Sequence, residues 1–171
     1  MAAAVIRWTS VDALYAADHE VHRARAREIG VDTPADVFEQ LFHEPHQDPV
    51  FALVVQWVDW AGVTWREIEL SGFVLAQVQV PREYEHAVEE ARARTLEQGL
   101  QDDRPEVGSH WHEASTWFRA PVLVTGEITD RRVSYELLVG FTRLGNLLGL
   151  IERGEVAPEK KHRVWVGSRI G

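Results

Sequence analysis

The sequence predicts a small α/β domain of the α+β kind, in which helices pack on a small mixed sheet behind an N-terminal helical extension. Three observations predict this fold. Residues 10–42 carry helix-start signals and apolar residues at helical spacing, whereas residues 50–80 are rich in Val, Phe and Trp. Residues 135–144 then read as a strand, a glycine and a helix. With 171 residues, the chain is long enough for one well-buried core.

The helical extension is expected over residues 1–48, ahead of a main domain over residues 49–171. Ser10 can cap a first helix that runs to about residue 27. Gly30 follows as a stop signal, because glycine readily adopts the left-handed conformation found just after helices.

The second helix of the extension begins at a proline. Thr33 is its expected N-cap, since Pro34 suits the first helical position and Asp36 completes a capping pattern. The polar break at residues 43–49 then separates the extension from the main domain.

The main domain is expected to begin with strands. Residues 50–60 and 63–70 are rich in β-branched and aromatic residues on either side of an Ala-Gly pair, which predicts a hairpin. Residues 73–80 predict a third strand, which Pro81 ends because proline cannot donate to a sheet.

A helix and a long loop are expected next. Residues 82–98 place apolar side chains on one face and many charges on the other, which predicts a surface helix. Residues 100–117 contain Gly, Pro, Asp and His without clear periodicity, so we expect a loop there. Loops of this length in compact domains are often functional.

Two short strands are expected in the second half, at residues 121–125 and 134–139, joined through a turn at residues 126–130. A last strand is expected at residues 163–166.

The helix expected at residues 141–152 is apolar nearly all round, so it should be buried on most sides. Gly145 and Gly149 lie four apart on one of its faces. They should let a strand or a second helix approach closely, at a cost of about 1 kcal/mol each in helix propensity.

Composition excludes several classes of function. The chain has no cysteine, which removes disulfides, thiolate metal sites and a cysteine nucleophile. Its net charge is −9, whereas nucleic-acid-binding domains usually carry clustered basic residues. This argues against direct DNA binding. The sequence shows no signal peptide and no membrane span of about 20 apolar residues, so we expect a cytoplasmic protein without membrane contact.

The glycine after the second-half strand is the expected functional site. A helix that begins after Gly140 points unpaired N–H groups and the positive end of its dipole at the space above that glycine. Thr142 and Arg143 add a hydroxyl and a guanidinium, so the turn suits a phosphate or a carboxylate. Three further cations are accessory candidates if the fold brings them near: Arg119, Lys160 and Lys161. The alternative is structural: Gly140 permits a tight connection and Arg143 pairs with an acid.

Two histidines are weak candidates for metal ligands. His110 and His112 alternate along a segment expected to be extended, which would place both on one side. There they could share a zinc ion with His43, His46 or Glu113. The alternative is that these histidines form hydrogen bonds or face water.

Motifs in the second half carry a resemblance to a known family. They are PVLV at residues 121–124, YELLVGFTRL at residues 135–144, a hydrophobic helix, and VWV at residues 164–166. This pattern resembles the nucleotide-binding half of the ParB/sulfiredoxin-like fold. The resemblance implies a small anionic ligand at Gly140, Thr142 and Arg143, with a nucleotide and its Mg²⁺ as the candidate.

The departures from that family concern catalysis. Sulfiredoxin activity is excluded, because it needs a cysteine where this chain has Phe141. The CTP-hydrolysing clamps place a glutamate in the turn, where this chain has Phe141 and Thr142. The kinase-like members carry an aspartate and a histidine, where this chain has Val139 and Phe141. The resemblance therefore implies a fold that is retained while catalysis is lost.

Three functions follow from the sequence. The first is a nucleotide- or phosphate-binding protein, catalytically degenerate. The second is a non-enzymatic interaction module of the inhibitor or immunity type, with a protein partner. The third is a phosphotransferase or hydrolase that uses Glu136 or Glu113 as a substitute base.

Overall fold

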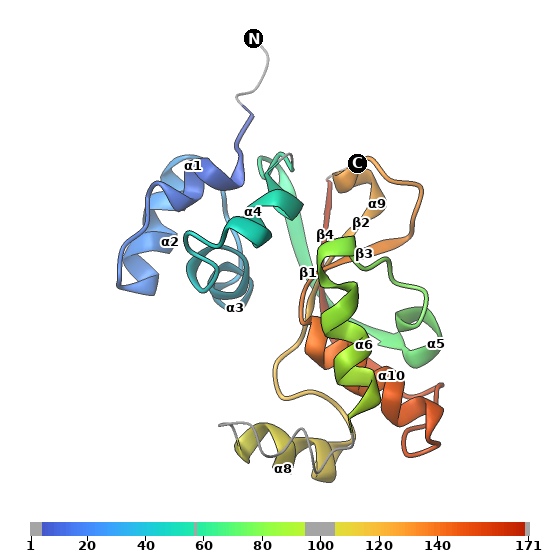
Figure 1. Cartoon of the computed structure of the whole chain (residues 1–171). Coiled ribbons are helices and arrows are strands. Elements are labelled where there is room, and N and C mark those ends of the chain that lie inside the picture. Colours follow the sequence, from blue (N-terminus) through green and yellow to red (C-terminus); the bar gives the residue numbers. More distant parts are fainter. Residues whose placement is uncertain (1–4, 57, 95–104, 170–171) are drawn as a thin grey trace.

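The computed structural model describes residues 5–56, 58–94 and 105–169. Within these ranges, the centre of the molecule is a mixed sheet with the strand order β1-β4-β2-β3 (Figure 1). The strands are β1 (Val63–Ser71), β2 (Val122–Thr125), β3 (Tyr135–Val139) and β4 (Lys161–Arg169). β4 runs antiparallel to β1 and parallel to β2, whereas β2 and β3 are antiparallel. This architecture confirms the expected small α+β fold.

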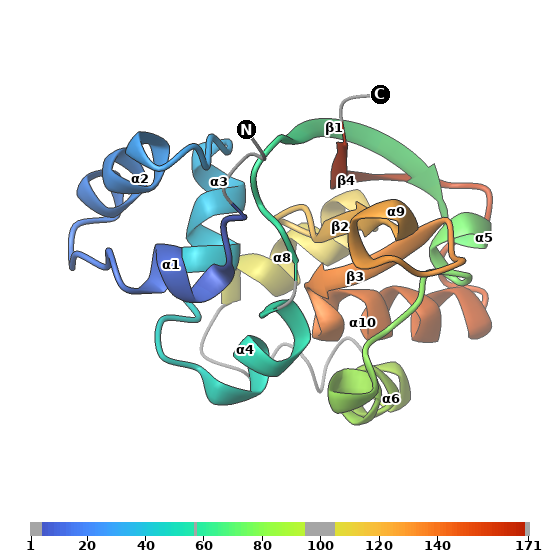
Figure 2. The same cartoon turned by 90° about the horizontal axis from the view of Figure 1, so that it is seen from above.

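The N-terminal helices cover one face of the sheet. They are α1 (Trp8–Asp12), α2 (His19–Glu28), α3 (Ala35–Phe38), the π-helical turn η1 (Glu39–His43) and α4 (Pro49–Val55). They lie together on one side of the sheet in both views (Figures 1 and 2). Their apolar side chains pack on Val122, Val124 and Leu138 to form what we call the N-terminal core. This core draws residues from both sides of residue 48.

The opposite face of the sheet carries the long C-terminal helix. The elements that follow β1 are α5 (Gly72–Leu75), η2 (Arg82–Tyr84), α6 (Glu85–Ala93) and α8 (Pro105–Ala114); α9 (Gly126–Thr129) follows β2, and α10 (Phe141–Glu152) follows β3. The α10 core includes buried side chains from α10, α5 and α8 together with four residues of the sheet, which are Leu123, Leu137, Val164 and Val166. Because side chains alternate along a strand, Leu123 faces this core while Val122 and Val124 face the other.

The two glycines of α10 permit a close helix contact, as the sequence predicted. A Cβ atom on Gly145 would lie 2.3 Å from the carbonyl oxygen of Val88, and one on Gly149 would lie 2.3 Å from that of Arg92. Both carbonyls belong to α6, so the absence of side chains at these positions lets α6 lie directly against α10 (Figure 2).

The N-terminal region has more breaks than predicted. The single helix expected over residues 10–27 is wrong: α1 ends at Asp12, and α2 starts anew because the Asp18 side chain accepts a hydrogen bond from the Val21 N–H. Thr33 is not an N-cap either. The extended backbone of Pro34 delays the start of α3 to Ala35, so Thr33 lies one position too early to reach the helix N–H groups.

The hairpin expected over residues 50–70 is half wrong. β1 is present, but α4 replaces the strand expected at residues 50–60. The Asp48 side chain accepts from the N–H groups of Val50 and Phe51, and Pro49 opens the helix. Capping and burial of one helical face therefore outweigh the strand propensity of the Val-rich run.

Other differences lie on the α10 side. Residues 73–80 form α5 and an isolated bridge from Gln79 to Glu136 instead of a strand. The turn expected at residues 126–130 contains the short helix α9, and β4 is longer than predicted. In the loop expected at residues 100–117, the described part contains the helix α8.

The predicted helix at residues 82–98 is present as η2 and α6 up to Ala93, and its last residues lie outside the described ranges. Within the described ranges, none of the helices has the length and apolar composition that crossing a membrane requires.

Candidate functional site

The chain reversal at Gly140 has the backbone geometry that the sequence predicted. Gly140 adopts a left-handed conformation with φ of 103°, and α10 starts at the next residue. A Cβ atom at this position would lie 2.6 Å from the Cβ of Pro121, so glycine is required both by its φ and by this contact. Thr142 is exposed in the first turn of α10, and Phe141 stacks on Tyr84 with ring centroids 4.0 Å apart.

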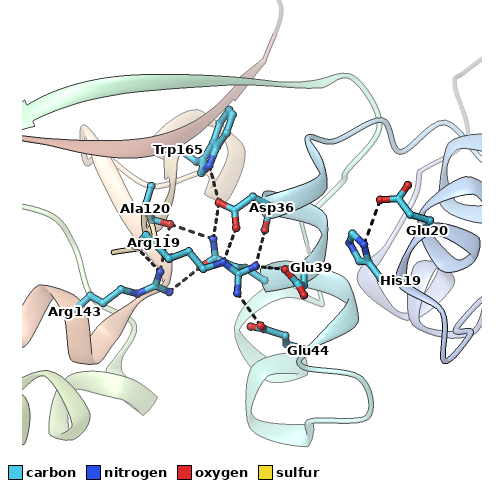
Figure 3. Close-up of polar contacts among 10 residues, drawn as sticks. His19, Glu20, Asp36, Glu39, Glu44, Arg119, Ala120, Arg143 and Trp165 are labelled. Atoms are coloured by element: carbon cyan, nitrogen blue, oxygen red, sulfur yellow. Dashed lines mark hydrogen bonds and ion pairs between the residues drawn. The ribbon is translucent and has the colours of Figure 1, made fainter. Parts of the chain in front are cut away.

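The guanidinium of Arg143 is bound by other parts of the protein (Figure 3). Its Nη1 donates to the carbonyl oxygens of Arg119 (2.8 Å) and Ala120 (3.4 Å), and its Nη2 donates to Oε1 of Gln40 at 2.7 Å. Gln40 is 2% exposed, and its own Nε2 donates to Asp36 and to the Ala120 carbonyl. Arg143 therefore joins the start of α10 to the segment before β2 and to η1.

Arg119 lies beside Arg143 and is held by three carboxylates. Its Nε donates to Asp36, its Nη2 to Glu39 at 2.6 Å and its Nη1 to Glu44 at 2.7 Å. Burial alone would lower the pKa of Arg119, but the hydrogen bonds to Asp36 and Glu44 outweigh burial and raise it above its ordinary value. The guanidinium is therefore charged at neutral pH.

The acceptors around the two arginines come largely from one short stretch, residues 36–44, in α3, η1 and the turn that follows. Asp36 also accepts from the indole Nε1 of Trp165 in β4 at 3.0 Å, which ties α3 to the sheet. We call this set the arginine network; its members are Gln40 and six residues that Figure 3 labels, Asp36, Glu39, Glu44, Arg119, Arg143 and Trp165. The network links the N-terminal helices to the start of α10.

The structure brings Arg119 to the predicted site and leaves the other accessory candidates elsewhere. Lys161 precedes Trp165 by four positions along β4, which corresponds to about 13 Å. Its neighbour Lys160 donates to the Ala114 carbonyl. Glu136 is 1% exposed near the other end of β3 and pairs with Arg131 at 2.8 Å; burial raises the pKa of its carboxyl group.

The predicted geometry of a histidine metal site is wrong. His110 and His112 lie on the helix α8, where residues two apart point to different sides, so they cannot share an ion. His110 instead lies edge-on to Phe118. Across the described ranges, no group of three or more His, Asp or Glu side chains is arranged to hold a metal ion.

Sequence reasoning missed Asp36 and Gln40 as partners of the arginines. A signal was present, because Asp36, Glu39, Gln40 and Glu44 recur at helical spacing and so lie on one face of a helix. Nothing in the sequence indicated that this polar face would meet residues 119–143. That contact is a product of the tertiary fold.

Comparison of the chain with protein-family models, with curated proteins and with solved structures found no match. The resemblance to the ParB/sulfiredoxin-like fold therefore stays a prediction, and the site has to be judged from its own geometry.

Proposed function

We propose that the protein binds a phosphate-bearing small molecule of the nucleotide class at the start of α10, and that residues 36–44 occupy this position in the unliganded protein. The supporting observation is that two neighbouring guanidinium groups are both paired with acceptors from residues 36–44. Arg119 and Arg143 lie side by side at the turn where the sequence predicts an anion, and each already holds an oxygen acceptor from that one stretch. The protein's own polar groups thus stand where ligand oxygens would bind.

Gln40 is the acceptor that a ligand would replace most readily. It is neutral, whereas a phosphate carries the charge opposite to that of Arg143 and can accept two parallel hydrogen bonds from its guanidinium. The carboxylates of Asp36, Glu39 and Glu44 exceed the two arginines by one negative charge, 3 − 2 = 1. A bound anion therefore requires part of residues 36–44 to move away from Arg119.

The proposal includes no reaction on the ligand. Val139 and Phe141 stand where the resembled kinase-like proteins carry an aspartate and a histidine, and neither side chain can move a proton. Glu136, the substitute base considered above, lies four residues before Gly140 and is paired with Arg131. We therefore expect binding without turnover.

Calorimetry with ATP and CTP, each with and without Mg²⁺, tests this proposal on the full chain. Replacing Gln40 with alanine should raise the affinity about tenfold, since it removes the acceptor that Gln40 offers to Nη2 of Arg143, and Arg143→Gln should abolish binding. Arg163→Gln is the matched control, because Arg163 is 63% exposed and forms a surface pair with Glu67. Absence of heat from both the wild-type protein and Gln40→Ala at millimolar nucleotide would contradict the proposal, and release of phosphate would show turnover.

A protein-interaction module is the second candidate. One observation favours it: Phe118, directly before Arg119, is 57% exposed although it is a large aromatic residue. Aromatic residues and arginine are enriched at protein interfaces relative to the rest of the surface. In that case the arginine network has only a structural role and no nucleotide binds. Phe118→Ser should then remove cross-linking to a specific partner without changing the thermal stability of the chain.

A further inference from the structure

A groove of about 530 Å³ lies where the end of α2 and the segment after it meet the start of β1. Its lining includes Arg23, Arg27, Asp32, Thr33 and Trp65. It shares no residue with the arginine network. A volume of this size is typical of sites for small organic ligands.

Two arginines one helical turn apart, Arg23 and Arg27, line the groove together with the carboxylate of Asp32. Arg23 donates through Nε to the Thr33 carbonyl at 3.1 Å and through Nη1 to Glu20 at 3.2 Å. Arg27 donates through Nε to Asp32 at 2.9 Å. In the described parts of the chain, no acceptor lies against Nη2 of Arg23 or against either Nη of Arg27. The groove therefore has guanidinium donors to spare in a protein whose net charge is −9.

Two buried donors in the same groove have no partner. The hydroxyl of Thr33, a residue only 4% exposed, and the indole Nε1 of Trp65 both lack a hydrogen-bond partner among the described residues. Buried polar groups in native proteins are nearly always satisfied, so each exception needs an explanation. Both orphaned donors belong to residues that line the groove next to spare guanidinium donors, so an acceptor-rich molecule bound there would supply their partners after a small shift of the side chains that cover them.

We propose that this groove binds an organic phosphate monoester, with its phosphate on Arg23 and Arg27 and the oxygens of its organic part on Thr33 and Trp65. The guanidinium donors that Glu20 and Asp32 leave unoccupied supply charge-assisted hydrogen bonds to the phosphate oxygens. Asp32, which orients Arg27, is the acceptor available to a ligand hydroxyl. A nucleic-acid polymer fits poorly, because two arginines cannot offset the repulsion from an acidic protein. The proposal does not depend on the function proposed for the start of α10.

Isothermal titration calorimetry of the full chain with ribose 5-phosphate, AMP, inorganic phosphate and succinate tests the site. We expect ribose 5-phosphate or AMP to bind more tightly than inorganic phosphate and succinate. Arg27→Gln should weaken that binding at least tenfold, and Thr33→Val should weaken it several-fold without lowering the melting temperature. Arg25→Gln is the matched control on the same helix, because Arg25 donates to the carbonyls of Leu14 and Tyr15 and does not line the groove; its affinity should stay within twofold.

Three results would overturn the assignment. The first is an absence of heat from all four probes at about 5 mM, a concentration at which a ligand with a millimolar dissociation constant still binds. The second is equal loss of binding in Arg25→Gln and Arg27→Gln, which would mean that only general charge matters. The third is succinate or inorganic phosphate binding as tightly as ribose 5-phosphate, which would remove the role given to the organic part.

Discussion

The arginine network and the groove are two places where residues 23–44 meet the sheet. They differ in whether their polar groups are paired within the protein. In the network, Trp165 of β4 donates its indole N–H to Asp36, and both arginines are surrounded by acceptors. In the groove, Trp65 of the neighbouring strand β1 has an indole N–H without a partner among the described residues. Two tryptophans that both pack against the N-terminal core thus differ in whether the protein completes their hydrogen bonds.

The difference teaches that the presence of arginine alone does not identify a ligand site. Side chains paired by the protein contribute to stability and must be released before they can bind anything else. Unpaired buried donors cost stability until a ligand supplies the acceptor. The groove therefore offers donors that hold no acceptor among the described residues, whereas the start of α10 accepts a ligand only by exchange.

The largest effect is expected from Arg143→Met. This change removes the donor of three hydrogen bonds and leaves Gln40 and two carbonyls with fewer donors, which should lower the free energy of unfolding by about 4 kcal/mol. Urea unfolding followed by circular dichroism measures it. Arg163→Met is the control and should change stability by less than about 0.5 kcal/mol, because its ion pair is exposed. Equal effects of the two substitutions would refute the structural role of the network.

A second prediction concerns His162, a buried residue whose Nε2 also lacks a partner among the described residues, but on the α10 side of the sheet. Burial, with a smaller contribution from Lys160, lowers the pKa of His162 to about 4, so the unfolded chain binds a proton that the folded chain rejects between pH 6.5 and 4. The stability present above pH 6.5 should fall by about 3 kcal/mol as the pH is lowered through this window.

Chemical denaturation at pH 7, 5.5 and 4 measures this loss, and NMR titration of the imidazole gives the pKa directly. His162→Gln should reduce the slope in this range by the contribution of His162, while His22, whose pKa burial also lowers, still contributes. An imidazole that titrates near pH 6.5 in the folded protein would contradict the prediction and show that water reaches this side of the sheet.

The smallest effect is expected in the groove and has the opposite sign. Thr33→Val replaces an unpaired buried hydroxyl by a methyl group of similar size, which should raise the free energy of unfolding by about 1 kcal/mol. Thr64→Val in the same groove is the matched comparison, because the Thr64 hydroxyl donates to the Ser168 carbonyl at 3.1 Å and its loss should cost about 1 kcal/mol. Thermal unfolding of the two variants measures both changes. If both substitutions shifted the melting temperature in the same direction, the contrast between the unpaired and the paired hydroxyl group would be refuted.

The elements that the sequence predicted well are those with local signals. The strand β3, the left-handed Gly140 and the helix α10 follow one another as predicted, because an apolar run, a glycine and a second apolar run leave few alternatives. The prediction failed at residues 50–60, where β-branched residues favoured a strand but Asp48 and Pro49 start a helix. The capping residues were visible in the sequence and deserved more weight than the propensity of the run.

Arg143 shows the limit of sequence reasoning about the site. Its position in the first turn of α10 was predicted, and so was the neighbourhood of a second cation, although only Arg119 of the three accessory candidates lies there. The direction of its guanidinium depends on Gln40, 103 positions away in the chain. Likewise, no local pattern links Thr33 to Trp65, although both line one groove.

The sequence by itself determined the class of fold, the strand-glycine-helix turn and the close contact that Gly145 and Gly149 permit, because backbone conformation and apolar periodicity are properties of neighbouring residues. The tertiary structure alone decided which polar groups are paired. Hydrogen bonds and ion pairs act only over a few ångströms, so a guanidinium is ligated or left open according to which distant segment packs beside it. In this protein, that packing paired the arginines at the start of α10 with acceptors and left donors between α2 and β1 without a partner among the described residues.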